Sequence, residues 1–162
     1  MFKSIVIMVA VGMNLMACSE NSSGPVEVKW DRDICERCRM MLSDRYHSAQ
    51  IRGGEKSKVY KFDDIGGAIL WLQDKDWKNN DATEIWVNDH RTGQWIDATK
   101  AWYVTGQSTP MEFGLGAQRE EPVDGINYAE AEVYIIEREK KYNQSGADLK
   151  EHADEHEHQH NH

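Results

Sequence analysis

Residues 58–72 read KVYKFDDIGGAILWL and join a strand-like segment to a helical one. Over residues 58–62 successive side chains alternate between two faces, which is the period of a strand. Asp63 or Asp64 then offers a side-chain cap for a helix. Apolar residues follow at i, i+3, i+4 and i+7 and mark one buried face: Ile65, Ala68, Ile69 and Leu72. The stretch predicts a strand over 58–62 and a helix that ends near residues 73–75.

Other segments on both sides of this unit are strand-like. The segments predicted as strands are residues 26–30, 47–52, 84–88 and 95–104. Residues 108–116 have the Pro and Gly content of a loop. Residues 128–142 mix β-branched residues with a Glu137/Lys141 pair at i, i+4, and the pair favours a helix. The order of elements predicts an α+β fold, and its rhythm suggests one pattern written twice.

The composition limits the kinds of protein that this chain can be. The chain has 162 residues, 40% of them hydrophobic, which allows one compact domain or two very small ones. Its 28 acidic residues outnumber its 19 Lys and Arg, giving a net charge of -9. An acidic balance argues against nucleic acid as a partner. Three cysteines are too few for a disulfide framework.

The N-terminus is predicted to be an export signal. Residues 1–17 carry Lys3 as their single charge, and their apolar stretch is too short to cross a bilayer. The end, Leu15-Met16-Ala17-Cys18, resembles a bacterial lipobox, which predicts a lipid on Cys18; the alternative is an ordinary signal peptide. Residues 18–27 then form a lipidated tether. The mature chain is expected in an oxidising compartment, anchored to a membrane.

The segment CERCRM at residues 35–40 carries the chemistry. Cys35 and Cys38 can point at one centre, and Met40 adds a soft donor. Thiolates with thioethers favour Cu(I) over hard cations. Met111, in a loop where an apolar side chain needs an explanation, is a further candidate ligand, and His47 is a borderline one.

Other interpretations of these residues stay open. Zinc is the first competing metal, although thioethers are poor zinc ligands and no second cysteine pair exists. A Cys-x-x-Cys pair in an exported protein is often a disulfide or a redox motif. The methionines also suit the role of gap-filling core residues, and a histidine in a strand is more often structural than a ligand.

The C-terminal tail, residues 143–162, has few apolar residues and is predicted to be disordered. It is rich in acidic residues and holds His152, His156, His158, His160 and His162. These imidazoles predict weak, auxiliary metal binding. The alternative is a solvated polar tail.

The combination of motifs resembles the NosL family, accessory lipoproteins of nitrous oxide reductase that act as copper chaperones. The matching stretches, in order, are Leu15-Met16-Ala17-Cys18, residues 35–40, Ser48-Ala49-Gln50-Ile51, residues 61–66 and Thr109-Pro110-Met111. The resemblance runs from the signal to about Ala117 and is more specific than the cysteine pair alone.

The resemblance implies two small related ββαβ-type domains, which we place at residues 28–80 and 81–142. It implies a Cu(I) site that passes copper to the apo form of nitrous oxide reductase in the periplasm, with an associated ABC-type complex. The matching ligand candidates are Cys38, Met40 and Met111, with Cys35 beside them and Asp63 orienting or ligating. The family often has Gly, then His, after the loop methionine. Here Glu112-Phe113 follow, so His47 becomes the likelier imidazole.

Three hypotheses about function follow from the sequence. The first is a Cu(I) carrier and not an enzyme. The second is an envelope-anchored thiol-disulfide oxidoreductase that uses Cys35 and Cys38 without metal. The third is a structural or adhesion lipoprotein with an incidental cysteine pair. Only the first uses the placement of the methionines.

Overall fold

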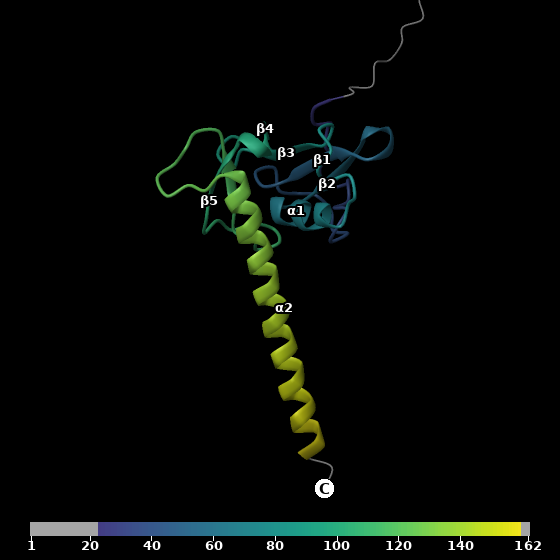
Figure 1. Cartoon of the computed structure of the whole chain (residues 1–162), viewed down its shortest axis with the longest axis vertical. Helices are drawn as coiled ribbons and strands as arrows, with labels where there is room; N and C mark the ends of the chain where they lie inside the picture. Colours follow the sequence, from purple (N-terminus) through teal and green to yellow (C-terminus); the bar gives the residue numbers. More distant parts are fainter. Residues whose placement is uncertain (1–22, 160–162) are drawn as a thin grey trace, which may run out of the picture.

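The computed structural model describes residues 23–159, and side chains over residues 23–145 (Figure 1). One antiparallel sheet has the strand order β2-β1-β3-β4. Its strands are β1 (Ala49–Gly53), β2 (Lys58–Phe62), β3 (Glu84–Asn88) and β4 (Trp95–Asp97). A second antiparallel pair joins β5 (Trp102–Val104) to β6 (Gly116–Gln118), and the helices are α1 (Ile65–Gln73) and α2 (Tyr128–Gln159). The predicted α+β class is confirmed.

The unit formed by β2 and α1 follows the predicted pattern. The Asp64 side chain caps α1 by accepting a hydrogen bond from the Gly66 amide at 2.7 Å. The predicted apolar face of α1 is buried and packs against β1 and β2: Ile65, Ala68, Ile69 and Leu72. Because the cap directly follows β2, Asp63 and Asp64 lie at the junction between the sheet and the helix.

The main sheet includes strands from both sides of residue 80, where the sequence placed a domain boundary. Strand β1 pairs with β2 on one side and with β3 on the other, so Ala49 lies opposite both Phe62 and Val87. The order β1, β2, α1, β3 is a ββαβ unit, and β3 completes it beyond the predicted boundary. The relatedness of two halves stays a prediction.

Two segments upstream of β1 differ from the prediction. Residues 26–30 form no strand, because the backbone of Val26 bonds to the Gln50 side chain, which donates to the Val26 carbonyl and accepts from its amide, each at 2.9 Å. His47 lies in a turn and not in a strand. The Asp44 side chain accepts from the Tyr46 and His47 amides, which delays the start of β1 to Ala49.

The region 95–104 and the strand after it also differ from the prediction. The single strand expected over 95–104 is split into β4 and β5 by a 3₁₀ turn at Ala98–Lys100, capped by Asp97. Residues 116–118, whose first glycine was assigned to a loop, form β6. A Cβ at Gly116 would lie 2.8 Å from the His90 ring, so only glycine permits this approach.

Helix α2 confirms the helix predicted over residues 128–142. Ala131 and Ile135 are buried against the rest of the protein. The backbone continues as helix to Gln159, beyond the predicted end at residue 142, and extends away from the sheets (Figure 1). Glu, Lys, Ala and Leu in this stretch are good helix formers. Disorder of the tail in solution stays a prediction.

No helix within residues 23–159 is both long and apolar enough to cross a bilayer. The predicted signal peptide and the lipidation residue Cys18 lie outside the described residues, and so do the side chains of the tail histidines.

Candidate metal centre

Residues 34–41 form a tight turn, which we call the cysteine hairpin. Ile34 and Met41 pair as an antiparallel bridge, and the Cys35 amide donates to the Met40 carbonyl at 2.8 Å. The Arg39 amide donates to the Cys35 carbonyl at 3.1 Å, and Arg39 has a φ of 65°, in the left-handed region. The turn therefore brings both thiols to one side of a short loop.

Strand β2 anchors this hairpin. The Glu36 amide donates to the Lys61 carbonyl at 2.8 Å, and the Lys61 ammonium pairs with Asp33 just before the hairpin. Asp63 lies two residues after Lys61, at the end of β2. The anchoring therefore places its carboxylate beside the thiols.

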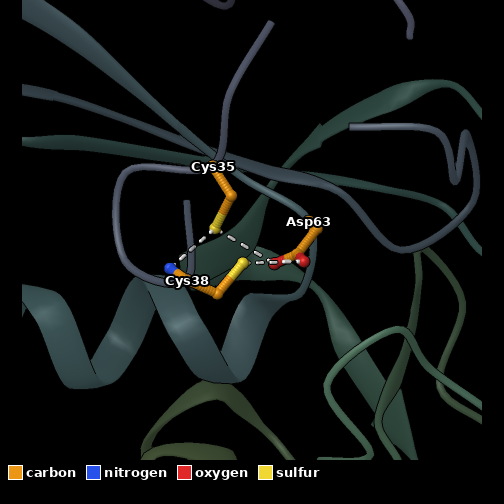
Figure 2. A group of neighbouring side chains, drawn as sticks. All are labelled: Cys35, Cys38 and Asp63. Atoms are coloured by element: carbon orange, nitrogen blue, oxygen red, sulfur yellow. Dashed lines mark hydrogen bonds between the residues drawn. The ribbon is translucent and has the colours of Figure 1, made fainter. Parts of the chain in front are cut away.

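The two thiols converge on that carboxylate (Figure 2). Cys35 Sγ donates to Asp63 Oδ1 at 3.2 Å, and Cys38 Sγ donates to Asp63 Oδ2 at 3.1 Å. The ligand atoms of these three residues all lie within 4.8 Å of one another. Both cysteines are free thiols. Cys35 and Asp63 are buried and Cys38 is half-buried, so the group is reached from the Cys38 side.

The environment keeps Cys38 protonated in the metal-free protein. Burial, together with the neighbouring Cys35 and Asp63, raises the pKa of Cys38 to about 12, although the Met40 backbone lowers it. A metal bound to Cys38 must displace the proton, so we expect metal affinity to rise with pH.

Alkylation of Cys38 tests this raised pKa. Because iodoacetamide reacts with the thiolate, we expect the rate at Cys38 to keep rising above about pH 10, where the rate at an ordinary thiol has levelled off. Asp63→Asn removes a hydrogen bond that raises the pKa and should accelerate labelling near pH 8. Peptide mass spectrometry resolves Cys38 from Cys35, and the denatured chain is the reference. A plateau near pH 10 in the folded protein, as in the denatured chain, would contradict the raised pKa.

Residues 109–113, which we call the methionine loop, lie beside the same junction. Burial raises the pKa of the Asp64 carboxyl, and the nearby Thr109 hydroxyl and Gly66 and Met111 amides lower it by less. Asp64 Oδ2 itself is buried without a hydrogen-bond partner among the described residues. The Phe113 ring packs on Gly66, where an added Cβ would lie 2.2 Å from Phe113 Cγ. The fold therefore places the half-buried Met111 near Asp64, the residue that follows Asp63.

Met40 and His47 are the remaining predicted ligands, and the role of Met40 as a ligand stays a prediction. The Met40 side chain is 48% exposed, while its carbonyl closes the hairpin. His47 Nδ1 lies 3.0 Å from Asp44 Oδ2, and its Nε2 is buried without a partner. His47 does not belong to the group formed by Cys35, Cys38 and Asp63.

Several residues that shape the site were not singled out as site residues from the sequence. Arg37 forms an ion pair of 2.7 Å with Glu139, 102 positions away in the chain. Phe113 and Asp64 connect the methionine loop to α1. The one signal for these contacts is the Gly66-Gly67 pair in the first helical turn, since small residues permit the close approach of a neighbour.

The candidate metal centre lies within a stretch of the chain that is similar to a known family. The family model for NosL matches residues 25–119. The chain belongs to the NosL family. The NosL match contains the cysteine hairpin, Asp63 and the methionine loop, and it ends before α2. A search of curated proteins gives no match.

A solved NosL structure shares the fold. It is described as the copper chaperone NosL from Shewanella denitrificans. Superposition gives a TM-score of 0.50 at 18% identity and covers 70% of this chain and 87% of that one. At this identity the likeness concerns the fold.

Proposed function

We propose that this protein is a Cu(I)-binding carrier, and not an enzyme, that delivers copper to the apo form of nitrous oxide reductase. We place it on the periplasmic side of a bacterial membrane, anchored by a lipid on Cys18. The observation that carries the proposal is the convergence of two free thiols on one buried carboxylate, beside the loop that holds Met111.

The choice of Cu(I) follows from the donors. Two thiolates make a soft site, and Met111 on the adjacent loop is a thioether that hard cations do not select. A structural zinc site would use four Cys or His ligands, and among residues 23–145 the group holds two cysteines and an aspartate. Membership of NosL, and a structural relative described as a copper chaperone, support the same metal.

The geometry favours loading and release by ligand exchange. Each thiol loses its proton on binding Cu(I), and Asp63, which accepts a hydrogen bond from both, is the nearest base. Cys35 is buried, whereas Cys38 is half-buried and partly reached by solvent. An incoming thiolate or imidazole from a recipient would therefore replace Cys38 first and reach Cys35 afterwards.

Anaerobic Cu(I) titration against a competing chelator tests the site. The protein used begins at Ser19 and has asparagine in place of the tail histidines. We expect one tight equivalent, and we expect Met111→Ala to weaken it by about tenfold, the order seen when a supporting partner of a metal site is removed. The control is Met41→Ala, because Met41 is a methionine that is 59% exposed at the base of the cysteine hairpin. Equal affinities in the two variants would remove Met111 from the site.

Delivery requires a separate experiment. Copper-loaded protein is mixed anaerobically with apo nitrous oxide reductase, alone and with the ABC-type complex that we propose as an intermediary, and copper is measured in each protein after separation. Transfer to the reductase faster than from a free Cu(I) chelate supports the proposal. Transfer at the rate of the chelate contradicts it.

The free thiols also favour a second candidate, an envelope-anchored thiol-disulfide oxidoreductase. That function predicts reversible formation of a Cys35–Cys38 disulfide and reduction of a substrate disulfide without metal. It also predicts that Met111→Ala leaves the activity unchanged. A redox titration of the metal-free protein, followed by an insulin-reduction assay, separates the two candidates.

A further inference from the structure

Two adjacent residues of α2 contact the methionine loop and the cysteine hairpin. Arg138 Nε donates to the carbonyl of Glu112 at 2.9 Å, next to Met111. An Arg37 guanidinium nitrogen donates to Glu139 Oε1 at 2.7 Å, next to Cys38. One helical turn therefore connects the methionine loop to the cysteine hairpin.

A cavity borders both contacts. It has a volume of about 460 Å³, and its lining includes Met111 and Phe113 of the methionine loop and Glu139 and Tyr142 of α2. Arg37 of the cysteine hairpin also lines this cavity, and its guanidinium lies 6.0 Å from the centre of the Phe113 ring. The hairpin, the methionine loop and α2 therefore meet around this space.

The methionine loop is locally rigid and needs an external anchor. The Glu112 amide donates to the Thr109 carbonyl at 3.0 Å, and the Gly114 amide donates to the Thr109 hydroxyl at 3.1 Å. Glu112 has a φ of 58°, so the turn is tightly closed. A tightly closed turn moves as one rigid unit. Its position is set by the packing of Phe113 on Gly66 and by the hydrogen bond from Arg138 to the Glu112 carbonyl.

We propose that Arg138 and Glu139 are positioning residues that hold the methionine loop, with Met111, against the cysteine hairpin and thereby set how tightly Cu(I) is retained. The inference rests on the proposed Cu(I) site. The Arg37–Glu139 pair has side chains that are 30% and 27% exposed, so salt reaches and screens it. Release of Cu(I) is therefore faster at higher ionic strength, through loosening of this pair.

The test is Cu(I) affinity and release rate in the chain from Ser19 to His162 with the tail histidines replaced. Glu139→Gln weakens Cu(I) binding by about tenfold and removes the salt dependence of release. Glu137→Gln is the matched control, since Glu137 is an exposed glutamate on the same helix. In a Met111→Ala background Glu139→Gln has no further effect, because both changes remove the same ligand. The charge swap Arg37→Glu with Glu139→Arg restores affinity and salt dependence.

Three results would overturn the inference: unchanged affinity in Glu139→Gln, an effect that adds fully to that of Met111→Ala, or equal effects of Glu137→Gln and Glu139→Gln. A wild-type chain that binds no tight Cu(I) would instead overturn the proposed function. The two failures are thus distinguished by the wild-type titration.

Discussion

Cys38→Ser is expected to abolish tight Cu(I) binding, with a loss of affinity of more than about 100-fold, since even partners outside the ligand set typically contribute 10–100-fold. The serine hydroxyl is similar in shape and can still donate to Asp63, 3.1 Å from the present sulfur. It is a hard ligand, however, and does not replace a thiolate for Cu(I). The loss is therefore chemical and not structural.

A comparison with Cys35→Ser separates binding from folding. Cys35 is fully buried, so a serine there places a smaller and more polar side chain in the core. We expect it to lower the free energy of unfolding as well as Cu(I) affinity, although its hydroxyl can still donate to Asp63. Cys38 is half-buried, and Cys38→Ser should leave the urea midpoint close to that of the wild type. Retention of tight Cu(I) binding by Cys38→Ser, measured anaerobically with a chelator, would remove Cys38 from the ligand set.

Gly66→Ala is expected to destabilise the protein by about 1–3 kcal/mol, the usual cost of overpacking a core. The new methyl group would lie 2.2 Å from Cγ and 2.3 Å from Cδ2 of the Phe113 ring, so the ring must move. Phe113 belongs to the methionine loop, and its displacement moves Met111. We therefore expect Cu(I) affinity to fall about tenfold together with the urea midpoint.

Gly67→Ala provides a control at the adjacent position. Its Cβ would lie 3.9 Å from Arg37 Cδ, which is ordinary contact. Alanine is a better helix former than glycine, so this variant should be neutral or more stable by up to about 1 kcal/mol. Urea unfolding followed by circular dichroism measures both variants. Equal midpoints for Gly66→Ala and Gly67→Ala would show that Phe113 yields without cost and would contradict the prediction.

The sequence determined the parts of this protein that depend on neighbouring residues. Alternation over 58–62 and the apolar spacing after Asp64 predicted β2 and α1 correctly, because side-chain period and capping act within a few residues. The Cys-x-x-Cys spacing likewise placed both thiols on one turn. Residues 26–30 were predicted incorrectly as a strand because their conformation depends on a distant partner, a side chain 24 positions away.

Only the tertiary structure decided how the site is assembled. Sheet pairing sets the end of β2 beside the cysteine hairpin, so that Asp63 accepts from both thiols across 28 and 25 positions. The methionine loop lies beside Asp64 and Gly66 although it comes much later in the sequence, and Glu139 of α2 pairs with Arg37 across 102 positions. Such contacts depend on how the whole chain packs around one core, and local periodicity carries no information about that packing.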